Sequence, residues 1–82
     1  MQAEEIKSLI ELKLENTTAL VYTQDNHHFE AIVISPLFEG KKLLDRQRLV
    51  NAVLNQFLID GSLHAISFKS YTADEWQVKN QD

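Results

Sequence analysis

The stretch GSLHAISFKSYTADEW, residues 61–76, contains the last strand and the start of the last helix that the sequence predicts. Between His64 and Ser70 the residues alternate, so that His64, Ile66 and Phe68 share one face of a strand. A histidine on an otherwise apolar face has two explanations. Either the histidine is hydrogen-bonded within the core, or its imidazole faces outward and binds a ligand.

The end of the same stretch predicts a helix. Thr72 and Glu75 form the T-x-x-E pattern of a capping box, and Tyr71 and Trp76 occupy the two positions of a hydrophobic staple. The polar tail that follows, residues 77–82, is expected to fray.

Four further elements are predicted before this stretch. They are a helix over about residues 3–14, strands over 18–23 and 29–35, and a helix over about 43–58. One arc of the second helix is expected to face the core, and it contains Leu43, Gln47, Val50, Leu54, Phe57 and Leu58. Pro36 ends the second strand, and the positive φ that Gly61 tolerates ends the second helix.

The order of elements is therefore α-β-β-α-β-α. The short polar connection QDNHH predicts an antiparallel hairpin, and the helix between the second and third strands allows a right-handed parallel crossover. A three-stranded mixed sheet covered on one face by helices satisfies both connections. We expect an α+β fold in a single domain over residues 1–82.

Composition excludes several classes of protein. The chain has no cysteine, so it cannot form a disulfide or supply a thiolate. The N-terminal MQAEEIKSLI has two acids where a signal peptide carries bases, and no apolar run approaches the ~20 residues that span a bilayer. A cytoplasmic protein that does not enter the membrane is expected, monomeric when alone.

Catalytic motifs are absent from the sequence. Capping and helix-dipole effects account for Asp74 and Glu75. Neither Ser35 nor Ser62 lies in a glycine elbow, and no phosphate-binding loop or carboxylate dyad is present. The sequence therefore favours a binding protein over an enzyme.

Three segments in combination, HFEAIVISPLFEG, RQRLVNAVL and LHAISFKSYTADEW, resemble the BolA-like family, in particular its short-loop bacterial branch. The resemblance extends from the first helix to Trp76. It implies a fold similar to the class II KH domain and a protein that is not an enzyme. It further implies binding to a monothiol glutaredoxin, with which family members share a [2Fe–2S] cluster in iron–sulfur assembly, trafficking or sensing, and it associates the chain with stress response.

The resemblance also implies the metal ligands. His64 matches the characteristic histidine of the family, and the loop between the first two strands usually supplies a second ligand. His28, beside Phe29, matches the family pattern, but His27 remains an alternative. A glutaredoxin cysteine and a glutathione thiolate would bind the other iron. Gln47 stands where many members have histidine, and Ala73 replaces a common proline.

A second function implied by the resemblance is transcriptional regulation through DNA binding. Four of the eight bases lie within eight residues, and these are Lys41, Lys42, Arg46 and Arg48. They could form a basic surface on a KH-like fold. However, the GXXG loop of KH domains is missing, because the corresponding turn reads FEGKKL, and the net charge of −4 disfavours general nucleic-acid binding.

Overall fold

The computed structural model describes residues 1–80 of the chain, and its elements follow the predicted order. They are α1 (Ala3–Lys13), β1 (Thr18–Thr23), β2 (His28–Ile34), a 3₁₀ helix η1 (Pro36–Phe38), α2 (Leu43–Ile59), β3 (Ala65–Tyr71) and α3 (Ala73–Asn80). Each predicted boundary given above lies within one residue of the observed one.

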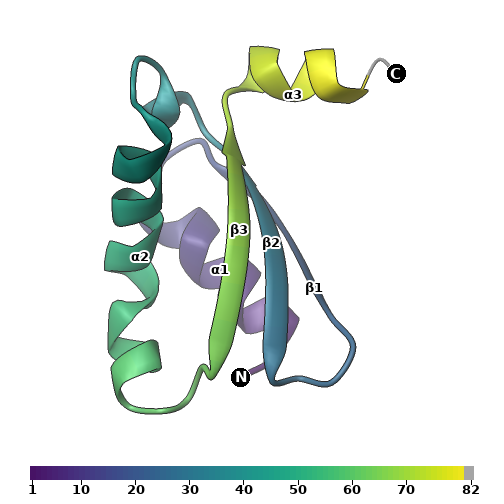
Figure 1. The fold of residues 1–82 in the computed structure, drawn as a ribbon, viewed down its shortest axis with the longest axis vertical. Coiled ribbons are helices and arrows are strands. Elements are labelled where there is room, and N and C mark those ends of the chain that lie inside the picture. The colour runs from purple at the N-terminus through teal and green to yellow at the C-terminus, as the bar shows by residue number, and fades with distance from the viewer. Residues whose placement is uncertain (81–82) are drawn as a thin grey trace.

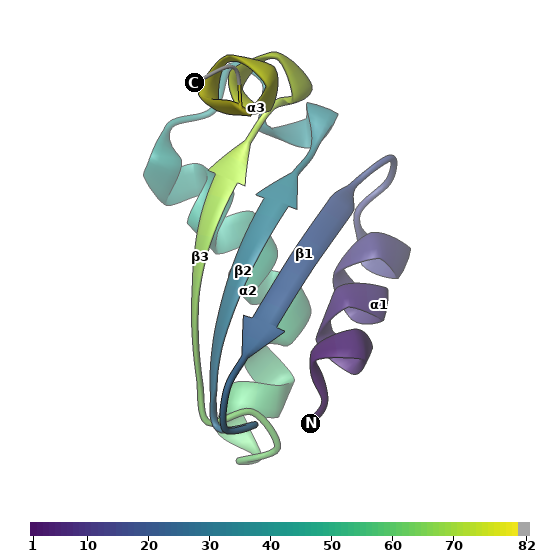
Figure 2. The same cartoon turned by 90° about the vertical axis from the view of Figure 1, so that its right-hand side faces the viewer.

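The strands form one mixed sheet in the order β1-β2-β3. β1 and β2 are antiparallel, with Thr18 opposite Ile34, and β2 and β3 are parallel, with His28 opposite Ala65. Helix α2 lies behind the sheet in Figure 2 and α1 flanks β1, so the face toward the viewer is free of helices. Helix α3 lies beyond the end of β3 (Figure 1). The predicted α+β fold is confirmed.

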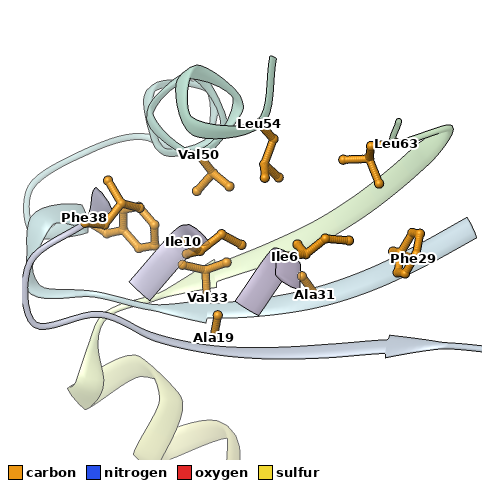
Figure 3. Packing of buried hydrophobic residues seen from close by; sticks show 11 residues of the cluster. Ile6, Ile10, Ala19, Phe29, Ala31, Val33, Phe38, Val50, Leu54 and Leu63 are labelled. Atoms are coloured by element: carbon orange, nitrogen blue, oxygen red, sulfur yellow. The ribbon is translucent and has the colours of Figure 1, made fainter. Parts of the chain in front are cut away.

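The core lies between the sheet and the two longer helices (Figure 3). Alternate residues of β2, namely Phe29, Ala31 and Val33, are buried, as the period of a strand requires. They pack against buried residues of α1 and α2, which are Ile6, Ile10, Val50 and Leu54. This packing fixes the position of each strand along the sheet. It therefore also fixes where the loops at the ends of the strands lie.

The inward arc of α2 differs from the predicted one. Leu43 is 67% exposed and Gln47 is exposed, whereas Arg46 is buried together with Val50 and Leu54. Arg46 can be buried because its guanidinium has hydrogen-bonding partners on three sides, described below. The first turn of α2 therefore presents the arginine to the protein and its leucines to the surface.

Helix α3 begins as predicted. Thr72 N–H donates to Glu75 Oε1 (2.9 Å), Glu75 N–H donates to Thr72 Oγ1 (3.3 Å), and the rings of Tyr71 and Trp76 lie 5.3 Å apart. The helix continues to Asn80, so 77–80 are helical here, although the sequence predicts a frayed tail from 77. Residues 81–82 lie outside the described part.

The outer edge of β1 is partly covered by α1. Lys7 Nζ donates to Ala19 O (2.9 Å), and Ala19 N–H donates to Glu11 Oε2 (3.0 Å). Lys7 and Glu11 also form an ion pair with each other, at 2.6 Å. Both backbone groups of Ala19 are thus unavailable to a further strand.

Among residues 1–80, no helix is both long and apolar enough to cross a bilayer. The expected cytoplasmic location and monomeric state remain predictions.

Candidate metal site

The three histidines gather at one end of the sheet. Because His28 lies opposite Ala65 in the parallel pair, the preceding residues of the two strands, His27 and His64, are neighbours as well. Their rings lie 5.1 Å apart between centroids, at an interplanar angle of 65°. Both side chains are exposed, so His64 is not the buried core histidine that a packing role would require.

Asp25 shapes the loop that carries His27. Its Oδ1 accepts hydrogen bonds from the backbone N–H groups of His27 (2.9 Å) and His28 (3.0 Å). These bonds, with the His28 ring, hold the pKa of the Asp25 carboxyl well below its usual range. Asn26 has a φ of 62°, a conformation that asparagine tolerates better than most residues, and this reverses the chain.

His28 points its ring at Asp25 rather than at His64. Its Nδ1 lies 3.2 Å from Asp25 Oδ2. Its backbone carbonyl accepts a hydrogen bond from Thr23 Oγ1 (2.7 Å), so the residue belongs to the loop's own hydrogen-bond network. The structure therefore places His27, and not His28, beside His64.

The entry to β3 is anchored next to His64. Leu63 is only 1% exposed, and its N–H donates to Phe57 O (2.9 Å). Asp60 Oδ1 accepts from the N–H of Ser62 (2.8 Å) and from its hydroxyl, which lowers the pKa of the Asp60 carboxyl. The backbone before His64 is thereby fixed while its imidazole remains exposed.

The histidine pair fits part of a metal site. Two imidazoles bound to one tetrahedral ion, with metal–nitrogen bonds of about 2.0–2.1 Å, place their ring centroids about 5 Å apart. The rings of His27 and His64 have that separation. Within residues 1–80, however, no cluster of three or more His, Cys, Asp or Glu side chains could hold an ion. The pair offers two donors, and any further ligands must come from another molecule.

The predicted basic surface lacks one of its four members. Arg46 is 7% exposed and forms a bidentate ion pair with Glu75, with N–O distances of 2.7 and 3.1 Å. Its other N–H groups donate to the carbonyl oxygens of Lys41 (3.0 Å) and Ser70 (3.3 Å), and its guanidinium lies 5.7 Å from the centre of the Phe38 ring. Arg46 therefore stabilises the fold and is not exposed to a phosphate.

The remaining three bases are exposed. Lys41 and Lys42 precede α2, and Arg48 lies 3.5 Å from Asp45 across one turn of that helix. The ion pair with Arg46 and the Thr72 N–H lower the pKa of Glu75 to about 2, and the pKa of Arg46 is raised in return.

Two features of these regions were not predicted from the sequence. Asp25 precedes the histidines by two and three residues, which is the spacing of an Asx turn and could have indicated its role. Arg46 stands four and eight residues before the apolar Val50 and Leu54, and this helical spacing could have indicated that it faces inward. Its pairing with Glu75 has no local signal, because the two residues are 29 positions apart.

The chain is similar to known proteins over most of its length. The family model for BolA-like proteins matches residues 5–75. A protein of Buchnera aphidicola subsp. Schizaphis graminum is 36% identical over 81 residues, covering 99% of each chain. The acid stress protein IbaG of Escherichia coli is 33% identical over 76 residues, covering 93% of this chain and 89% of its own.

A solved structure gives the same result in three dimensions. The BolA homologue of Coxiella burnetii superposes with a TM-score of 0.82 at 39% identity, over 94% of this chain and 97% of its own. The match of sequence, element order and sheet extends over nearly the whole chain. The chain therefore belongs to the BolA-like family.

Proposed function

We propose that this protein binds a [2Fe–2S] cluster jointly with a monothiol glutaredoxin and glutathione, and that His64 and His27 supply its share of the ligands. The observation that carries the proposal is the exposed pair of imidazoles, 5.1 Å apart, at the end of the parallel strands. The protein would act by binding and not by catalysis, in the assembly, trafficking or sensing of clusters.

The donor set suits a shared cluster. A [2Fe–2S] cluster needs four ligands, and this chain has no cysteine. Two imidazoles on one iron resemble the Rieske arrangement, which has a higher reduction potential than plant-type clusters bound by cysteine alone. The other two ligands would be the cysteine of the glutaredoxin and the thiolate of glutathione.

The choice of His27 over His28 follows from their surroundings. His27 lies beside His64, whereas the His28 ring faces the Asp25 carboxylate. The pattern of the sequence alone favours His28, because it precedes Phe29 as in the family. We give the geometry more weight, since a ligand must reach the same iron as His64.

The test is reconstitution of the cluster with a monothiol glutaredoxin, glutathione and iron and sulfide under anaerobic conditions. Visible absorption and circular dichroism would follow the mixed cluster, and size-exclusion chromatography the heterodimer. We expect His64→Ala and His27→Ala each to abolish the mixed-cluster spectrum. An unchanged spectrum with His64→Ala would refute the proposal.

His28→Ala is the matched control. It removes the same type of side chain from an exposed position at the start of β2, one residue away from His27. We expect this variant to keep the spectrum of the unmodified protein. If His28→Ala abolishes the cluster while His27→Ala does not, the shared cluster stands, but the second ligand is His28 and the loop rearranges on binding.

Imidazole binds a metal only in its neutral form, so protons compete with iron. The mixed cluster should therefore be released as the solution is acidified. Recording the visible spectrum of the heterodimer during an acid titration would measure this release.

A further inference from the structure

The two edges of the sheet differ in how far their backbone groups are engaged. At the β1 edge, Lys7 and Glu11 bind both backbone groups of Ala19. At the β3 edge no helix lies in front of the strand in Figure 1. An open strand edge is a template on which another strand can pair.

Hydrogen bonds at the end of β3 show which of its residues have backbone N–H and C=O groups that point away from β2. Tyr71 O accepts from Ser35 N–H (2.9 Å) on the β2 side, whereas Ser70 O accepts from Arg46 on the other side. Because backbone groups of successive strand residues point in opposite directions, those of Ile66 and Phe68 point away from β2 with Ser70. Within residues 1–80, the structure gives these two residues no hydrogen-bond partner on that side.

A groove accompanies this open edge. It has a volume of about 350 Å³ and is lined by Leu43, Gln47, Phe68, Lys69, Ser70 and Tyr71. Ser70, Tyr71 and Leu43 also line the adjoining hollow of about 390 Å³, which extends to Lys41, Lys42, Arg46 and Glu75. The exposed Leu43, which the helical pattern predicts to be buried, thus forms one wall beside the strand.

The charges around the groove are mainly positive, in a chain whose net charge is −4. Lys41, Lys42 and Lys69 are exposed, and the charge of Arg46 is balanced by Glu75. Glu39 is the further acid whose field reaches Arg46. Three lysines against one glutamate favour a negatively charged occupant.

We propose that the outer edge of β3 binds an extended, acidic segment of a partner protein as a fourth strand. Its backbone pairs with Ile66 and Phe68, an apolar side chain enters the groove beside Leu43, and its acids face Lys42 and Lys69. A second copy of this chain is a poorer occupant, because pairing two β3 edges brings two sets of lysines together. The proposal requires no metal and does not depend on the proposed cluster.

The probe is a fluorescein-labelled seven-residue peptide of alternating glutamate and valine, which equals β3 in length. Anisotropy at low salt measures its binding, and amide hydrogen exchange by NMR reports on Ile66 and Phe68. We expect saturable binding with slower exchange at these two amides. Absence of binding at millimolar protein, or binding that leaves both amides unchanged, would overturn the proposal.

Methylation of the peptide backbone separates strand pairing from simple charge attraction. In two versions of the peptide, alternate amides carry N-methyl groups in the two complementary patterns. One pattern removes the donors that face β3, and it should weaken binding about tenfold, since at least two hydrogen bonds are lost and each is worth roughly a factor of two to ten. The other pattern should bind like the parent peptide. Equal binding by both versions would exclude a fourth strand.

Matched variants test the role of charge. Lys42→Glu should weaken peptide binding about fivefold, the effect of a favourable exposed charge pair. Lys13→Glu makes the same change on α1, away from this groove, and should leave binding unchanged.

Two further results would assign the edge of β3 to a different occupant. A single-stranded oligonucleotide of equal charge that displaces the peptide and protects the same amides more strongly would assign the edge to nucleic acid. Concentration-dependent protection of Ile66 in the protein alone would assign it to a second copy.

Discussion

The two ends of the sheet differ in what their polar side chains bind. At the α3 end, Arg46, Glu75 and Thr72 bind one another and the neighbouring backbone, and Arg46 and Thr72 are buried. At the opposite end His27 and His64 are exposed, and their rings lie beside each other. Groups whose hydrogen bonds are made within the chain stabilise the fold. Exposed side chains that are held in place, such as these imidazoles, are available to a ligand. The following variants test this contrast between the two ends of the sheet.

The largest loss of stability is expected from Arg46→Met. The change leaves the carbonyl groups of Lys41 and Ser70 and the Glu75 carboxylate without their donor. We expect the free energy of unfolding to fall by about 2 kcal/mol, less than for a fully buried ion pair because Glu75 is half-exposed. Urea denaturation followed by circular dichroism would measure it. Lys41→Met, which removes an exposed charge from the same segment, should change the stability little.

Glu75→Gln should cost less than Arg46→Met, because a glutamine keeps one acceptor oxygen and Arg46 keeps both carbonyl acceptors. Its main effect is on pH dependence. The pKa of Glu75 is lowered to about 2 in the folded protein from an ordinary value of 4.5. The stability this group contributes is therefore fully present above pH 4.5 and is lost as the pH falls toward 2.

The corresponding measurement is the free energy of unfolding of both proteins between pH 7 and pH 2. The unmodified protein should lose stability more steeply below pH 4.5 than Glu75→Gln. Parallel curves over this range would mean that Glu75 has the same pKa in the folded and unfolded chains.

Thr72→Ala removes the hydroxyl that accepts from the Glu75 N–H at the start of α3. Loss of such a cap costs about 1 kcal/mol. Thermal unfolding should show it, and Thr72→Ser, which keeps the hydroxyl, should recover most of the loss. An equal loss in the serine variant would point to the buried methyl group instead of the cap.

The smallest effect on stability is expected for His64→Ala and His27→Ala. Both side chains are exposed, so the free energy of unfolding should change by no more than about 0.5 kcal/mol. The same variants are expected to lose the shared cluster. If either one unfolds the protein, its histidine is a structural residue, and the contrast between the two ends of the sheet fails.

Much of the fold was accessible from the sequence because its signals are local. The alternation between His64 and Ser70, the capping box at Thr72 and the glycine at 61 each predict a feature that the structure contains. Gly61 has a φ of 83°, as a helix end with a left-handed residue requires.

The remaining features depend on contacts between distant segments. Arg46 is buried because Glu75, on another helix, neutralises it, and no pattern within α2 contains that information. Which histidine of the loop lies beside His64 depends on how Asp25 and Asn26 turn the chain. Adjacent histidines on such a turn point in different directions, so residue spacing alone left His27 and His28 as alternatives.

The unequal edges of the sheet also limit how the protein can assemble. A strand that pairs with β3 meets an available backbone, but α1 occupies the β1 edge at Ala19 with the Lys7–Glu11 ion pair. A second copy paired with β3 would present a β1 edge on which both backbone groups of Ala19 are already bonded. This hinders the addition of a third copy and the growth of a row of copies into a fibril.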